Sequence, residues 1–121
     1  MTAVSVPATS DGAFVATQCL TRARALLAPE MDSAVLRVSG DLLPAVKEHL
    51  AGGGKHVRAG ILLAAAAACG APEGTGLAGA AAIELVHNCS LVHDDIIDRD
   101  TERRHRPTLW AEHGIGHAII A

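Results

Sequence analysis

The sequence predicts an all-α fold, and three observations support this prediction. Half of the 121 residues are hydrophobic, alanine dominates among them, and the only aromatic residues are Phe14 and Trp110. Apolar residues recur at helical spacing, and no run of alternating β-branched residues indicates a sheet. Small side chains of this kind are typical of helices that pack closely together.

The first third of the chain carries little functional signal, and we expect its role to be structural. Residues 1–10 are small and polar with one proline, and we expect them to be disordered. Asp11 can cap a helix that runs to about Ala28. Pro29 suits the first turn of a second helix, which we place up to about Leu50 with a kink or a division at Pro44.

A run of glycines at residues 52–54 then breaks the pattern, and a further helix begins near His56 and continues to Gly70. Glycines before a helix N-terminus, followed by Lys55 and Arg58, can bind phosphate through backbone N–H groups, the helix dipole and full charges. The same spacing is also typical of an ordinary flexible loop, so both interpretations stay open on spacing alone.

After a turn at residues 71–74, a long helix begins at residues 75–76 and ends near Asp98. Asp94 and Asp98 are one turn apart, so both project from one face, about 6 Å apart along the axis. With Asp95 they place three carboxylates at the unfavourable end of the helix dipole. A cation is therefore expected here, and carboxylate ligands indicate Mg²⁺.

The residues that follow this helix are basic. Arg103, Arg104 and Arg106 come before Pro107, and guanidinium groups match phosphate oxygens in bidentate geometry. Carboxylates that bind a metal, followed by a basic loop, are the groups needed to hold a diphosphate from both sides. A last helix is expected from about Thr108 to the end of the chain.

The motif LVHDDIIDRDTERRHRPT, at residues 91–108, closely resembles the first aspartate-rich region of the trans-isoprenyl diphosphate synthases, also called polyprenyl synthetases. That region is a DDxxD followed by RRxxPT. The segment GGGKHVRAGIL, at residues 52–62, resembles the family's GGK-x-x-RP segment, with His56 in place of a common arginine and Ala59 in place of the usual proline. The resemblance runs from about Leu42 to the last residue.

The resemblance implies a prenyltransferase that condenses isopentenyl diphosphate with an allylic diphosphate. Asp94 and Asp98 would bind Mg²⁺ bridging the allylic diphosphate, with Asp95 in support, and Arg103 would hold the same diphosphate. Together the metal and these residues would stabilise charge as diphosphate leaves. The residues implied for isopentenyl diphosphate are Lys55, Arg58, His87 and Arg104. Without the resemblance, we would interpret His87 as a core histidine.

The resemblance also implies what surrounds this site. In the family, residues about one turn before the first aspartates form the floor of the product cavity. Here they are the small residues Cys89 and Ser90, which predicts a product of twenty carbons or more. Residues 11–121 would be the N-terminal portion of an antiparallel helix bundle whose second aspartate-rich motif is absent. We therefore expect this portion to be inactive alone, and to form a homodimer when complete or to pair with a complementary C-terminal half.

Three other functions would use parts of this pattern. A class I terpene synthase also uses DDxxD, but the glycine segment, His87 and the paired arginines argue against it. An HD-type phosphohydrolase would use His93 and Asp94 and would leave the other aspartates unexplained. A non-catalytic partner of a complete synthase remains as an alternative.

Composition limits the remaining possibilities. The formal net charge of −3 predicts neither nucleic-acid binding nor binding to acidic membranes. Cys19, Cys69 and Cys89 are odd in number and widely spaced, which favours reduced core residues. No signal peptide or membrane span is evident, so we expect a soluble cytoplasmic protein. His113 and His117 have metal-ligand spacing but no third ligand, which argues against zinc.

Overall fold

The computed structural model describes residues 9–37 and 41–121, and the side chains from residue 16 onward within those ranges. The predicted disorder of residues 1–10 falls mostly outside the described residues, although Thr9 already belongs to the first helix. Within these ranges six helices and one short hairpin follow one another: α1 Thr9–Val35, α2 Leu42–Ala51, α3 Val57–Ala68, α4 Leu77–Asp98, β1 Glu102–Arg103, β2 Arg106–Pro107, α5 Leu109–His113 and α6 Ile115–Ile120. The predicted all-α class is confirmed.

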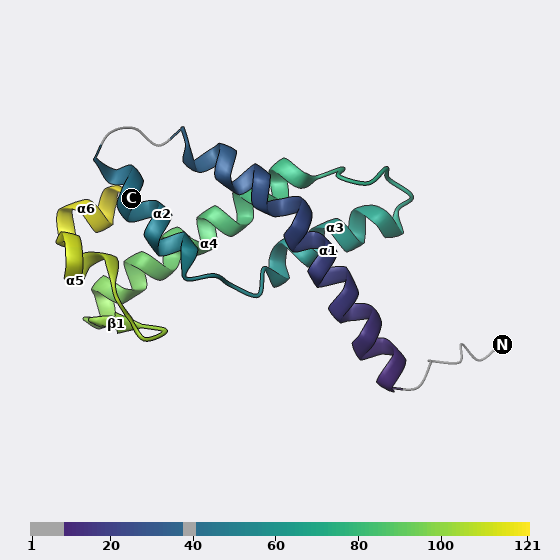
Figure 1. Cartoon of the computed structure of the whole chain (residues 1–121), viewed down its shortest axis with the longest axis horizontal. Coiled ribbons are helices and arrows are strands. Elements are labelled where there is room, and N and C mark those ends of the chain that lie inside the picture. Colours follow the sequence, from purple (N-terminus) through teal and green to yellow (C-terminus); the bar gives the residue numbers. More distant parts are fainter. Residues whose placement is uncertain (1–8, 38–40) are drawn as a thin grey trace.

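The helices form an elongated arrangement around α4 (Figure 1). Helices α1 and α3 contact its N-terminal part and each other, while α5 and α6 contact its C-terminal part. Helix α2 contacts both α1 and α5, and the hairpin lies at the same end of the molecule as α5. The glycine segment (residues 52–62) includes the start of α3, which packs against α4, and the aspartate-rich motif (residues 91–108) begins within α4. Both motifs therefore lie along this helix.

Helix α1 continues through Pro29, so the predicted boundary at that residue is wrong. The proline removes one backbone hydrogen bond, to the carbonyl of Ala25, which lies on an exposed part of the helix where water can replace it. Buried residues follow a four-residue spacing across the proline, at Leu27, Met31 and Val35. Packing of this stripe outweighs the local effect of the proline.

The interruption predicted at Pro44 lies upstream of it. Helix α2 begins at Leu42, so Pro44 occupies the first turn, where a backbone N–H has no partner within the helix. The predicted starts of α3 and α4 agree with the structure to within about two residues, which is the usual uncertainty of helix ends.

The core is built from small residues, as the composition predicts. One buried cluster joins α1, α3 and α4, and a second joins α2, α4, α5 and α6. Gly60 shows how closely α1 and α3 approach, because a Cβ atom there would lie 2.6 Å from Leu20 Cδ2. The two clusters contain Leu27, Met31, Ala59, Ala80 and Ala81, and Ala45, Val92, Leu109 and Ala118, respectively.

The cysteines do not belong to this core. Cys19, Cys69 and Cys89 are free and exposed, so the prediction that they are core residues is wrong. Alanine fills the small buried positions instead. Within the described residues, no helix combines the length and apolar character that crossing a bilayer requires.

The hairpin between α4 and α5 was not predicted from the sequence. Glu102 pairs with Pro107 and Arg103 with Arg106, which leaves Arg104 and His105 as a two-residue loop. Both loop residues have positive φ, 53° and 63°, as a type I′ turn requires. Glycine and asparagine usually fill such turns, so this loop carries strain.

We expect His105→Gly to stabilise the chain by about 0.5–1 kcal/mol, because glycine relieves the left-handed strain but adds entropy to the unfolded chain. Urea unfolding of both chains measures the difference. Glu102→Gly, within β1, is the matched control and should destabilise. A His105→Gly chain no more stable than the parent would contradict this account of the loop.

Candidate functional site

The three aspartates at the end of α4 lie in two different environments. Asp94 and Asp98 are exposed, whereas Asp95 is only 2% exposed. Consecutive helical residues are about 100° apart around the axis, so Asp95 turns inward while its neighbours face solvent. Asp94 and Asp98 therefore present two carboxylates one turn apart, a donor set that suits Mg²⁺, which commonly takes one or two protein carboxylates.

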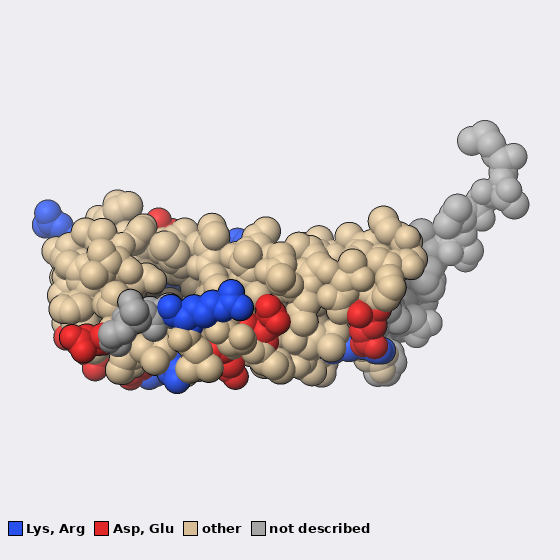
Figure 2. Space-filling view, turned by 90° about the horizontal axis from the view of Figure 1, so that it is seen from above, with Lys and Arg blue, Asp and Glu red and all other residues tan. Residues whose placement is uncertain are grey.

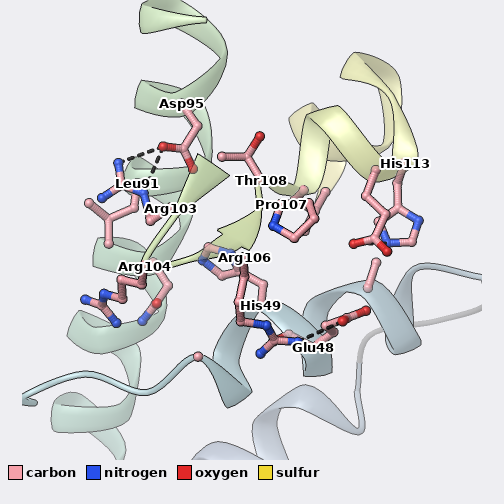
Figure 3. A pocket seen from close by; sticks show the side chains of 15 residues that line it. Glu48, His49, Leu91, Asp95, Arg103, Arg104, Arg106, Pro107, Thr108 and His113 are labelled. Carbon is pink, nitrogen blue, oxygen red and sulfur yellow. Dashed lines mark hydrogen bonds and ion pairs between the residues drawn. The ribbon is translucent and has the colours of Figure 1, made fainter. Parts of the chain in front are cut away.

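Asp95 is paired with the first arginine of the hairpin (Figure 3). Arg103 Nε donates to Asp95 Oδ1 at 2.8 Å, and Nη2 lies 2.7 Å from the same oxygen. This hydrogen bond raises the pKa of Arg103 above its ordinary value. The resemblance implied that Asp95 supports the metal site and that Arg103 holds a diphosphate. In the structure these two side chains form an ion pair with each other.

The pair lies in a pocket bounded by α2, α4, the hairpin and α5 (Figure 3). Three arginines and three carboxylates line it, so its charges are balanced. The charged and imidazole side chains that line it are Glu48, His49, Asp95, Arg103, Arg104, Arg106, Glu112 and His113.

The other two hairpin arginines reach the C-terminal end of α2. Arg106 Nη2 lies 2.8 Å from Glu48 Oε1, and its Nη1 donates to the Glu48 carbonyl at 3.3 Å. Arg104 Nη1 donates to the carbonyl of Gly53. Cations are favourable near the free carbonyls of a helix C-terminus. These contacts hold the hairpin against the segment that carries the glycines.

His49 faces the same pocket from α2 and is half-buried. Burial lowers its pKa below the ordinary 6.5, and the charge of Asp95 opposes this effect in part. The imidazole is therefore neutral at physiological pH. The sequence offered no signal for this residue.

His49 should make the stability of the fold depend on pH in one direction. Its contribution is fully present above a pH of about 6.5 and is lost as the pH falls through the lowered folded pKa, because the unfolded chain then binds the proton more readily. We expect His49→Gln to reduce the loss of stability below that pH in urea unfolding. His117→Gln, at an exposed position, is the control, and an equal acid dependence in all three chains would contradict the assignment.

Lys55 and Arg58 are exposed and flank the start of α3, beside the glycine loop (residues 52–55). The Lys55 carbonyl accepts a hydrogen bond from Arg24 Nη2 at 3.2 Å. Figure 2 shows one face of the molecule, on which separate basic and acidic side chains are scattered over a mostly uncharged surface. On this face the basic residues form no continuous patch.

The N-terminus of α3 is capped by a buried carboxylate that the sequence analysis did not single out. Glu84 Oε1 accepts the backbone N–H of Ala59 at 3.1 Å, and Glu84 Oε2 lies 3.2 Å from His56 Nδ1. Part of the positive helix end that was predicted for phosphate is therefore occupied by Glu84. Its spacing of eleven residues from Asp95 places both buried carboxylates on one face of α4.

The other residues of α4 that the sequence analysis named are either exposed to solvent or partly buried. His87 is half-buried, and its carbonyl accepts a hydrogen bond from Ser90 Oγ at 2.7 Å. Cys89 and Ser90 are exposed. His93 Nε2 lies 3.3 Å from the carbonyl of Ile119, so His93 contacts α6.

One further group of possible metal ligands converges in the part of the chain that the structure describes. The ligand atoms of Glu48, Glu112 and His113 lie within 4.8 Å of one another. All three residues are exposed, and Glu48 already pairs with Arg106. His117 Nδ1 contacts the carbonyl of His113 at 2.9 Å.

Comparison with known proteins adds to this geometry. The family model for polyprenyl synthetases matches residues 41–121. The (2E,6E)-farnesyl diphosphate synthase of Mycobacterium tuberculosis is 39% identical over 110 residues, which span 82% of this chain and 31% of that protein. The geranylgeranyl diphosphate synthase of the same organism is 52% identical over 67 residues, which span 55% of this chain and 19% of that protein.

A solved structure is similar in both fold and sequence. The crystal structure of polyprenyl synthetase from Streptomyces coelicolor matches with a TM-score of 0.81 and 38% identity, over 86% of this chain and 34% of that one. The chain thus spans about a third or less of the length of each of these proteins. The family match covers both the glycine loop and the aspartate-rich end of α4, and on these grounds the chain belongs to the polyprenyl synthetase family.

Proposed function

We propose that this chain supplies the diphosphate-binding part of a prenyltransferase that condenses isopentenyl diphosphate with an allylic diphosphate in the cytoplasm. The observation that carries the proposal is the pair of exposed carboxylates, Asp94 and Asp98, one turn apart beside an arginine-bearing hairpin. The names of the similar synthases, which make farnesyl, geranylgeranyl and polyprenyl products, support it.

In this proposal Asp94 and Asp98 hold Mg²⁺, which when bound supplies charge that stabilises the departing diphosphate. Arg103 contributes positive charge at the same end of α4, and Asp95 fixes its orientation through the buried pair. The allylic carbon–oxygen bond breaks, the isopentenyl double bond forms the new carbon–carbon bond, and a proton is then lost. No side chain needs to act as a nucleophile.

Isopentenyl diphosphate would bind beside the glycine loop, where Lys55 and Arg58 offer exposed cations, and His87 on α4 is proposed as a third contact. Arg104 would join them by exchanging its contact with the Gly53 carbonyl for a phosphate oxygen, a charge-assisted bond that is stronger than one to a neutral carbonyl.

We further propose that catalysis needs more chain than these residues provide. Ile83, Val86 and Ile97 are large apolar side chains left exposed along the same helix as Asp94 and Asp98. Covering such a row removes apolar surface from water and would place other groups opposite the two carboxylates. The covering helices would come from a longer form of the protein, which would then form a homodimer, or from a complementary C-terminal half.

The test compares the chain alone with a chimera in which it replaces the matching third of the Streptomyces coelicolor polyprenyl synthetase. Labelled isopentenyl diphosphate, an allylic diphosphate and Mg²⁺ are supplied to both. We expect product from the chimera and none from the chain. Robust turnover by the chain as a monomer would refute the need for further helices. A folded chimera without activity, beside an active parent enzyme, would refute the function and favour a non-catalytic partner.

Product length is proposed to be twenty carbons or more. Cys89 and Ser90 are exposed one turn before Asp94, on the side where the growing chain would pass. A helical turn rises about 5.4 Å, close to the length of one isoprene unit, so one side chain can stop one round of elongation. Small side chains leave this level open.

Ser90→Phe in the chimera should therefore shorten the product, as read by chromatography after removal of phosphate. Val86→Phe, one turn further back, should stop elongation at a later round and serves as the matched variant. An unchanged product distribution in an active Ser90→Phe enzyme would mean that this face does not line the product cavity.

A further inference from the structure

Glu84 is a buried carboxylate that the proposed chemistry does not use. It is 3% exposed and lies on α4, three residues before His87. Its two oxygens contact His56 and the backbone N–H of Ala59, both in the segment that begins α3. One buried side chain thus joins α4 to the segment that carries the two proposed phosphate-binding cations.

Among the residues that the structure describes, no other side chain caps the start of α3. His56, at the N-cap position, has a left-handed φ of 48° and makes no capping hydrogen bond of its own. Ala59 is fully buried, so water cannot satisfy its N–H. A buried donor without a partner is unfavourable, and a carboxylate at a helix N-terminus is favourable. Glu84 therefore determines where this helix begins and how the preceding loop enters it.

Among the described residues, two side-chain contacts reach the glycine loop itself, and both are exposed. Arg24 donates to the Lys55 carbonyl at 3.2 Å, and Arg104 donates to the Gly53 carbonyl. Exposed contacts of long side chains contribute little because water competes and side-chain entropy is lost. Glu84 contacts His56 and Ala59, which directly follow this loop, and these contacts are better shielded from water, so they set how the loop enters α3.

We propose that Glu84 is a positioning residue for isopentenyl diphosphate. It fixes the glycine loop and the first turn of α3 against α4, so that Lys55 and Arg58 stand at a constant distance from His87. The inference rests on the proposed function, because it assumes that these three residues hold one diphosphate. Glu84 acts through its two partners and does not itself contact the ligand.

The test measures two affinities of the chain by calorimetry: isopentenyl diphosphate alone, and geranyl diphosphate with Mg²⁺. We expect Glu84→Ala to weaken isopentenyl diphosphate binding by about tenfold or more, as is typical when a supporting residue is removed. Binding of geranyl diphosphate with Mg²⁺ at Asp94 and Asp98 should stay within about twofold, because that end of α4 keeps its contacts. Glu84→Gln keeps an acceptor for the Ala59 N–H and should restore most of the lost affinity.

Two controls separate positioning from general loss of stability. Leu27→Ala opens a cavity in the core cluster next to Ala59 and should lower stability while leaving both affinities unchanged. His56→Gly removes the imidazole contact at a position where glycine is unstrained, so it folds and should weaken isopentenyl diphosphate binding in part.

The outcomes are distinct. If Glu84→Ala and His56→Gly bind isopentenyl diphosphate as tightly as the parent chain, or if Leu27→Ala weakens it equally, the positioning role is overturned while the proposed function stands. If neither the parent chain nor the chimera binds either diphosphate, the proposed function itself fails and the inference with it.

Discussion

Replacing Asp94 or Asp98 with alanine in the chimera should lower kcat by about a hundredfold or more, because each change would remove a proposed ligand of a metal whose charge would matter most as diphosphate leaves. Both side chains are exposed and make no contact in the described structure that the fold depends on. Stability should therefore stay close to that of the parent, and the loss should appear in kcat with only a small change in KM for isopentenyl diphosphate.

Asp100→Ala is the matched control for this prediction. Asp100 is an exposed carboxylate just beyond the end of α4, and its carbonyl, not its side chain, accepts the hydrogen bonds of Thr108 Oγ1 and Trp110 Nε1. Losing its carboxylate changes the net charge as Asp98→Ala does but leaves the donor pair intact. Equal losses of kcat in Asp100→Ala and Asp98→Ala would mean that the effect is one of overall charge.

Replacing Arg103 with methionine should destabilise the chain by about 2–3 kcal/mol, because it leaves the Asp95 carboxylate buried without its charged partner. The full effect of breaking a buried pair is reduced here because the Arg103 side chain is 31% exposed, so water can reach part of the gap. Urea unfolding with an unchanged slope would show that the difference lies in stability alone.

A double-mutant cycle tests the same pair from the other side. Asp95→Leu combined with Arg103→Met removes both charges and should recover most of the stability lost in Arg103→Met. Arg106→Met, which breaks the exposed contact with Glu48, is the matched control and should change stability by less than about 1 kcal/mol. If Arg103→Met and Arg106→Met lowered the stability by the same small amount, burial of the Asp95 carboxylate would not depend on its pairing with Arg103.

The local sequence was sufficient for the parts of this structure that depend on periodicity. The start of α3 after the glycines and the end of α4 near Asp98 agree with the prediction, because glycine and the apolar pattern act within a few residues. The motifs, read by resemblance, led to the family. The exposed pair formed by Asp94 and Asp98 follows directly from helical spacing.

The parts that failed depend on contacts between distant segments. Pro29 would end many helices, but the buried stripe of Leu27, Met31 and Val35 continues α1 past it. In the sequence, Asp95 cannot be distinguished from Asp94 and Asp98. It is the buried partner of Arg103 because the hairpin brings Arg103 back to α4. Glu84 caps a helix twenty-five residues upstream, a relation that no local pattern indicates.

The central claim is that Asp94 and Asp98 bind a diphosphate through Mg²⁺, and one measurement tests it most directly. Geranyl diphosphate is titrated into the chain by calorimetry, with and without Mg²⁺, and the titration is repeated on the Asp94→Ala/Asp98→Ala chain. Binding to the parent chain should require Mg²⁺ and should be lost in the double variant, while isopentenyl diphosphate still binds both. A double variant that binds geranyl diphosphate with the same affinity and the same dependence on Mg²⁺ would contradict the claim.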